Sequence, residues 1–173
     1  MTHDITILTP DQPHLTARKS YRPSDGPIPE KIGSTPFATY YCWRTERLAE
    51  GAELMSLMEL LGRLADEPRS LRIGGVPAMF MVPGEPVQRT KEFFDPPPGV
   101  RLLLVDVDGW DTDIEWWESP EKLRLALHTL LEARGLDYLS ASRCVVALSQ
   151  SAWPHGKLKC HLYYWLDDEI TLD

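Results

Sequence analysis

The chain has 173 residues, of which 43% are hydrophobic and 25% charged, a composition typical of a globular protein. Its net charge of −8 argues against a passive nucleic-acid coat, which usually presents a basic surface, but not against an enzyme that handles nucleic acid through bound cations. No apolar run reaches the ~20 residues needed to span a bilayer, and the three widely spaced cysteines form no C-x-x-C pair. We therefore expect no structural zinc, no membrane association and a reduced, cytoplasmic setting.

The first 45 residues are predicted to form a proline-rich arm followed by a first strand. Residues 10–36 contain six of the 15 prolines, which cannot donate hydrogen bonds to a helix or a central strand. Residues 37–43 have the aromatic composition of a strand. The arm also carries a basic cluster that either contacts phosphate or is simply solvated (Arg18, Lys19 and Arg22).

Residues 46–95 are predicted to form a smaller N-terminal α/β module. A helix is expected over 46–66, because Pro68 follows this segment and five apolar residues at helical spacing would form one buried stripe (Leu54, Leu57, Met58, Leu61 and Ala65). Short strands are expected near residues 70–73, 77–82 and 89–94, where glycine and proline mark the turns between them.

Residues 96–173 are predicted to form a β-α-β-β module. An apolar strand at 101–107 leads into an acidic loop, and the serine and proline at 119 and 120 are a typical helix start. Gly135 ends this helix, whose buried stripe is formed by Leu123, Ala126, Leu127, Leu130 and Leu131. Strands at 144–149 and 158–166 have a short connection, so we expect them to pair as a hairpin. The fold class expected for the whole chain is α+β.

Two aspartates separated by one valine follow the apolar residues of the first strand of this module. Because side chains alternate along a strand, Asp106 and Asp108 are expected to point the same way. Two neighbouring carboxylates repel one another unless a divalent cation or a shared proton compensates for their charge. Oxygen ligands suit a hard cation, so the pair predicts a site for Mg²⁺ or Mn²⁺.

The last strand carries a second charged pattern. Lys157, Lys159 and His161 occupy alternate positions and therefore share one strand face. Such a face is unfavourable unless it is wet or meets an anion, and a polyphosphate would satisfy it. The alternative is an exposed edge strand that its lysines protect from aggregation. Together with the aspartate pair, the pattern favours metal-dependent nucleotidyl transfer.

The order of these motifs resembles that of a known family. An apolar strand with D-x-D, a helix, an apolar strand ending in serine and a strand with K-x-x-x-H occur in that order in the archaeo-eukaryotic primase (AEP) superfamily, in its primase-polymerase branch from plasmids, phages and integrated elements. The resemblance covers about residues 89–168. Asp106 and Asp108 stand at the first motif, and Lys159-Cys160-His161 stands at the S-x-H motif with lysine in place of serine.

The resemblance implies a fold, an activity and a set of partners. The fold would be an AEP/RRM-like catalytic sheet packed with helices, and the activity that of a DNA primase or primase-polymerase acting on nucleoside triphosphates and a single-stranded DNA template, with a helicase or other replication protein as a further partner. Asp106, Asp108 and His161 would be catalytic, and the nucleotide would contact Lys157, Lys159, His161, Ser149 and Ser151. Candidates for contact with nucleic acid are Arg18, Lys19, Arg89 and Lys91, and three tryptophans would either stack on bases or cap the core (Trp110, Trp116 and Trp117).

The family has a third acidic motif on a later strand, and no clear match to it occurs here. Either the chain is the N-terminal part of a longer catalytic domain, or the third ligand is absent or relocated. One alternative function is a phosphatase of the haloacid dehalogenase type, with Asp106 as nucleophile and Asp108 as acid and base. Another is a non-catalytic module of the same fold that binds nucleotide or nucleic acid.

Overall fold

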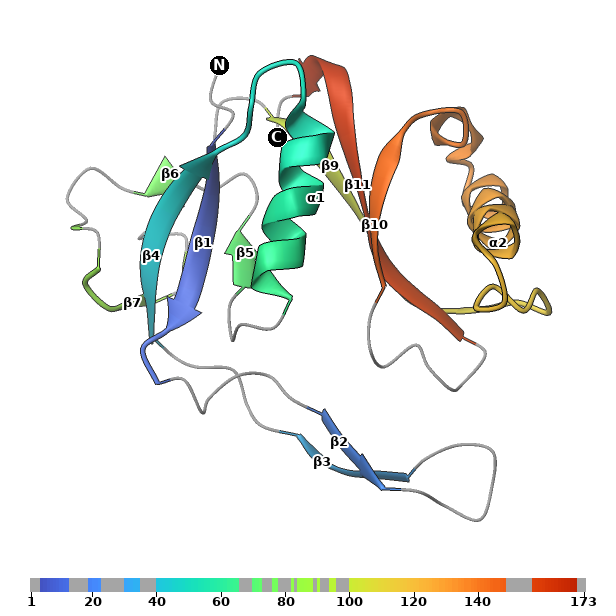
Figure 1. Cartoon of the computed structure of the whole chain (residues 1–173), viewed down its shortest axis with the longest axis horizontal. Helices are drawn as coiled ribbons and strands as arrows, with labels where there is room; N and C mark the ends of the chain where they lie inside the picture. Colours follow the sequence, from blue (N-terminus) through green and yellow to red (C-terminus); the bar gives the residue numbers. More distant parts are fainter. Residues whose placement is uncertain are drawn as a thin grey trace. The chain divides into compact units, whose positions relative to one another are not determined.

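The computed structural model describes residues 4–12, 19–22, 30–34, 40–65, 70–72, 76–77, 82, 84–88, 90, 94–95, 100–148 and 157–170. Contacts between residues divide the chain into two units. Figure 1 labels the helices and strands along the chain. Unit 1 comprises residues 1–21, 31–102 and 165–173, and unit 2 comprises residues 22–30 and 103–164. No helix in the described part of the chain is long and apolar enough to cross a membrane.

Unit 1 is built around strand β1 (Asp4–Pro10), which the sequence patterns did not predict. It lies inside a four-stranded sheet of order β5-β1-β4-β7, made with β4 (Tyr40–Arg47), β5 (Ser70–Arg72) and β7 (Val87–Gln88). β1 pairs antiparallel with both β4 and β5. Consecutive residues on β1, from Ile5 to Leu8, are at most 3% exposed, so both faces of this strand are covered. The N-terminal segment is therefore a core strand rather than part of an extended arm.

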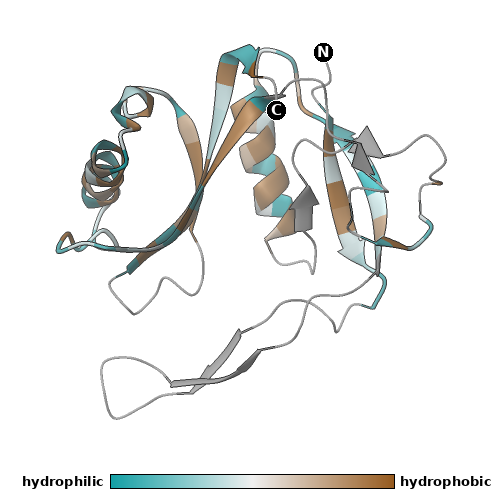
Figure 2. Cartoon of the chain, turned by 180° about the vertical axis from the view of Figure 1, so that it is seen from behind, coloured by the Kyte–Doolittle hydropathy of each residue, from teal (hydrophilic) through white to brown (hydrophobic). Residues whose placement is uncertain are grey.

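Helix α1 (Glu53–Leu64) is shorter than predicted because β4 continues to Arg47, where the sequence pattern indicated helix. Leu57 and Leu60 are buried, whereas Met58, expected in the buried stripe, is 47% exposed. The buried face is therefore rotated from the predicted one, toward positions 53, 57, 60 and 64. Figure 2 shows the apolar residues of β1 and α1 in brown.

Four further strands form two small ladders. β2 (Lys19–Arg22) pairs with β3 (Glu30–Ser34), and β6 (Val76–Pro77) pairs antiparallel with β8 (Phe94–Asp95). Short strands were expected near β5 and β8. The strand predicted over 77–82 is represented in the described residues only by β6.

The predicted β-α-β-β order occurs over residues 100–170, most of which belong to unit 2. β9 (Val100–Asp111), α2 (Pro120–Ala133), a 3₁₀ turn (Asp137–Leu139), β10 (Cys144–Leu148) and β11 (Lys157–Ile170) follow one another along the chain. The sheet order is β10-β11-β9, so the last strand lies between the other two. β10 and β11 form the predicted antiparallel pair, with Val146 opposite Leu162. The α+β class is confirmed.

Most of the buried residues of β11 lie on one face of this sheet. Every second residue of β11 from Leu158 to Tyr164 is at most 2% exposed, as strand alternation requires. Helix α2 contributes Ala126, Leu127, Leu130 and Leu131 to the buried set, which confirms most of its predicted stripe. Gly135 follows the helix with φ +67°, the left-handed conformation that commonly ends a helix.

Candidate functional site

Three close contacts between an acidic and a basic side chain connect β9 to β11 in unit 2, two of them lysine–aspartate ion pairs. His161 Nε2 lies 3.3 Å from Asp106 Oδ1, and Lys159 Nζ lies 2.9 Å from Asp108 Oδ1. Lys157 Nζ lies 3.1 Å from Asp111 Oδ2. The partners run in opposite order along the two strands, which is the arrangement of an antiparallel pair. We call these six residues the charge ladder.

The ladder places the sequence-predicted residues on one face. Asp106, Asp108, Lys157, Lys159 and His161 alternate along their strands with the buried residues, as the strand period predicts. The Asp106 side chain is 66% exposed and that of Asp108 81% exposed, whereas Lys159 is only 24% exposed. Both aspartates are therefore accessible to solvent and to ligands, while each already faces a cationic or basic side chain.

Asp111 is the ladder residue that the sequence pattern missed. Its spacing from Asp108 is three residues, whereas Lys157 and Lys159 are two apart, so β9 contains one extra residue between the second and third pairs. Such an extra residue is the mark of a β-bulge, and Gly109 at that point has φ +90°. The predicted end of the strand at residue 107 was therefore wrong: β9 continues through Gly109 and returns Asp111 to the face of the two motif aspartates.

The surroundings of His161 are partly aromatic. Its ring meets Tyr163 edge to face, with centroids 6.2 Å apart. Tyr163 is buried at 5% exposure, and this burial raises the pKa of its hydroxyl. Tyr163 therefore provides a buried support beside an imidazole that is half exposed.

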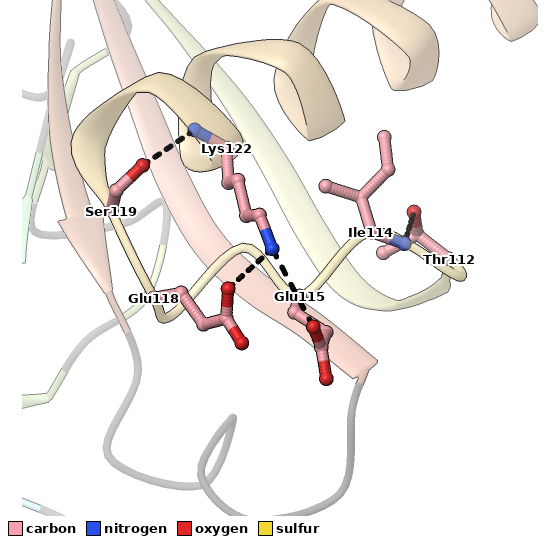
Figure 3. Close-up of polar contacts among 6 residues, drawn as sticks. All are labelled: Thr112, Ile114, Glu115, Glu118, Ser119 and Lys122. Atoms are coloured by element: carbon pink, nitrogen blue, oxygen red, sulfur yellow. Dashed lines mark hydrogen bonds and ion pairs between the residues drawn. The ribbon is translucent and has the colours of Figure 1, made fainter.

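The acidic loop after β9 is tied to the start of α2. Lys122 forms ion pairs with Glu118 and with Glu115, as Figure 3 shows. The hydrogen bond from Lys122 lowers the pKa of Glu118. Ser119 caps the helix by accepting a hydrogen bond from the Lys122 backbone N–H at 3.2 Å, and Pro120 is the first helical residue, as predicted (Figure 3). Two of the loop's acids therefore have a local structural partner.

The three tryptophans near the ladder have different environments. Trp116 is 5% exposed and belongs to the core, so the capping alternative holds for this residue. Trp117 is 39% exposed and meets Trp116 edge to face. The Arg134 guanidinium lies 5.7 Å from the centroid of the Trp110 ring, so this tryptophan contacts the C-terminal end of α2.

Several predicted contact residues lie outside the described residues. These are Ser149 and Ser151, proposed for the nucleotide, and Arg18, Arg89 and Lys91, proposed for nucleic acid. Lys19 belongs to β2, whose backbone alone is described.

The described residues contain no group of three or more His, Cys, Asp and Glu that could hold a metal ion by itself. Asp106 and Asp108 nevertheless offer accessible carboxylate oxygens on one face. Mg²⁺ is commonly held by one or two carboxylates, with substrate phosphates and water completing its coordination. The donor set therefore fits a cation that arrives together with a polyphosphate.

A separate hollow of about 670 Å³ occurs on unit 1, around the start of α1. Its lining includes Glu46 and Arg63, which form an ion pair with each other, and Arg47, which pairs with Asp4 at 2.9 Å. Three of its five charged lining residues thus form ion pairs within the unit, namely Glu46, Arg47 and Arg63. None of the sequence-predicted site residues lines it.

Comparisons with protein-family models, curated proteins and solved structures find no match to this chain.

Proposed function

We propose that the protein is a divalent-metal-dependent nucleotidyltransferase of the primase-polymerase type, with the charge ladder as its nucleotide site. The observation that carries this proposal is the common face of Asp106, Asp108 and His161, which come from two strands 45 or more residues apart in sequence. Across the sheet, Asp106 contacts His161 and Asp108 contacts Lys159.

The proposal assigns a role to each part of the ladder. Asp106 and Asp108 would hold Mg²⁺ or Mn²⁺, and this cation would neutralise negative charge on the transferring phosphoryl group. Lys157, Lys159 and His161 would contact the phosphates, the lysines as point charges and the imidazole as a hydrogen-bond donor. A single-stranded DNA template and a replication protein such as a helicase remain the proposed partners.

The contacts within the ladder would keep its neighbouring carboxylates stable when no ligand is bound. Each carboxylate faces a basic group, which offsets the repulsion between neighbouring carboxylates. On binding of a triphosphate with its divalent cation, the partners would exchange: Asp106 and Asp108 would face the cation, and the basic groups would face the phosphates. Only Asp111 would be left without a partner of opposite charge.

A binding measurement tests the proposal directly. Titration calorimetry of the protein with a non-hydrolysable nucleoside triphosphate and Mn²⁺ is expected to give saturable binding, which Asp106→Ala should weaken at least tenfold, because charge-assisted contacts of this kind contribute roughly 1.5–3 kcal/mol. The matched control is Asp113→Ala, which removes the same charge from the exposed acidic loop and should leave the affinity within about twofold.

The reaction itself is tested with a single-stranded template, nucleoside triphosphates and Mn²⁺. Template-dependent extension that is lost in Asp108→Asn supports the proposal. Absence of any triphosphate binding contradicts it, and metal-dependent hydrolysis of an aryl phosphate by the wild type but not by Asp106→Asn would instead identify the phosphatase alternative.

A further inference from the structure

We propose that Asp111 is a specificity-determining residue that makes polyphosphate binding depend on a divalent cation. This inference rests on the proposed function of the charge ladder. It concerns the ladder residue that lies outside the D-x-D motif and reaches the common face through the bulge at Gly109.

The position of Asp111 sets its role. Its carboxylate lies 3.1 Å from Lys157 Nζ, at the end of the ladder beyond the two motif aspartates. Lys157 and Asp111 are both well exposed, at 48% and 77%, so the contact between them is easily exchanged with a ligand. The Lys157 ammonium has three N–H donors and only one faces Asp111, so a phosphate that binds Lys157 comes close to the Asp111 carboxylate.

The balance of charge across the ladder gives the specificity. Three carboxylates face two lysines and one histidine, so a polyphosphate without a metal meets as many negative groups as basic ones. A bound divalent cation occupies Asp106 and Asp108 and leaves Asp111 as the remaining carboxylate close to the phosphates. A polyphosphate with a bound divalent cation carries two fewer negative charges than the metal-free polyanion, so Asp111 opposes the metal-free polyanion more strongly than the metal complex.

The bulge is what places this third carboxylate. In a regular strand, position 110 would follow Asp106 and Asp108 on the same face, and that position holds tryptophan. The extra residue at Gly109 shifts the alternation of side chains along β9 by one position, so Asp111 rather than Trp110 lies opposite Lys157. Trp110 instead contacts Arg134 of the helix end.

The experiment measures inorganic tripolyphosphate binding by calorimetry, with Mn²⁺ and separately with EDTA, for the wild type, Asp111→Asn and Asp113→Asn. Asp111→Asn is expected to tighten metal-free binding about fivefold and to change binding with Mn²⁺ less than twofold, since an exposed ion pair contributes up to ~1 kcal/mol. Asp113→Asn removes the same charge two residues away and should change neither affinity by more than about twofold. Adding Lys157→Ala to Asp111→Asn should abolish the gain in EDTA.

The outcomes separate this inference from the proposed function. If the wild type binds tripolyphosphate with Mn²⁺ but Asp111→Asn and Asp113→Asn behave alike in EDTA, the role of Asp111 is wrong while the site stands. If the wild type binds no tripolyphosphate with Mn²⁺, the proposed function and this inference both fail. Circular dichroism and melting temperatures of the variants, expected to be unchanged for these exposed isosteric substitutions, confirm that folding is not the cause.

Discussion

Gly109 is the residue on which the geometry of the charge ladder depends. Its φ of +90° lies in the region that residues with a Cβ rarely adopt. A Cβ at this position would lie 3.6 Å from Lys159 Cε, an ordinary contact, so the cost of a substitution comes from the backbone rather than from a clash. Gly109→Ala is expected to reduce the free energy of unfolding by about 1–2 kcal/mol, as measured by urea denaturation.

Gly62 provides the matched control for this prediction. It lies within α1, and a Cβ built on it meets no atom within 4 Å. Gly62→Ala should therefore stabilise the protein by about 0.5–1 kcal/mol through helix propensity. Equal effects of the two substitutions would contradict the backbone strain assigned to Gly109.

Cys160 is the buried thiol of β11, beside the ladder residues but on the opposite face. Burial raises the pKa of its thiol from 9.0 to about 12. The folded state therefore holds its proton at a pH where the unfolded chain has lost it, so this contribution to stability is complete below about pH 9 and is lost as the pH rises toward 12. Between pH 8 and pH 10.5, the free energy of unfolding should fall more steeply for the wild type than for Cys160→Val, as measured by urea denaturation at each pH.

Alkylation checks the same assignment independently. At pH 8, native protein treated with iodoacetamide should leave Cys160 unmodified, while denatured protein should be modified at all three cysteines. Rapid modification of Cys160 in the folded protein would show that its thiol is not protected.

At the level of residues, the sequence is sufficient wherever the strand period is unbroken. Asp106 and Asp108 share a face, and so do Lys157, Lys159 and His161, because two-residue spacing on a strand decides which way a side chain points. Asp111 could not be placed in this way. A bulge changes the period by one residue, and its presence depends on how β9 pairs with a strand about 50 residues later.

Among the elements, helix α2 is the one whose ends the sequence defines best. Ser119 accepts a hydrogen bond from the Lys122 N–H, Pro120 has no N–H to leave unpaired, and Gly135 terminates the helix. Ser119→Ala is expected to lower the free energy of unfolding by about 1 kcal/mol, within the 0.5–2 kcal/mol range of N-cap losses, whereas Ser119→Asp should retain most of the stability. Thermal unfolding of both variants measures the difference. A stable Ser119→Ala protein would mean that the ion pairs of Lys122 hold the helix start instead.

The start of α1 shows why a local pattern can assign the wrong element. Residues 44–47 read Arg-Thr-Glu-Arg, a polar sequence acceptable at the start of a helix, yet they form the end of β4. Their partners are the first residues of β1, with Arg47 opposite Asp4 and an ion pair between them. Pairing with a strand about 40 residues away decided the conformation, and no local propensity records such a partner.

On the scale of the whole molecule, strand pairs that are adjacent along the chain were predicted better than pairs that are far apart. The hairpin of unit 2 is of the first kind, and the pairs of β1 in unit 1 are of the second. β10 and β11 are adjacent along the chain, and their hairpin was predicted from a short connection. In unit 1, β1 lies between β4 and β5, which begin more than 30 and 60 residues later. Its seven residues include a proline and two threonines, so they lack the clear alternation that would have marked a central strand.

The net charge of the molecule makes a last prediction about the proposed ligand. At long range, a nucleoside triphosphate experiences the net charge of the chain, −8, and is repelled. The lysines of the ladder attract it only at short range. Added salt screens this long-range repulsion, with a screening length of about 30 Å at 0.01 M and about 8 Å at 0.15 M ionic strength. The association rate constant for a triphosphate analogue with Mn²⁺, measured by stopped-flow fluorescence, should therefore rise about two- to fivefold between these salt concentrations. A rate that falls with salt would mean that Lys157, Lys159 and His161 dominate the field at the site. The basic residues of the ladder would then attract the triphosphate over a longer range than we expect from a site with three carboxylates opposite three basic groups.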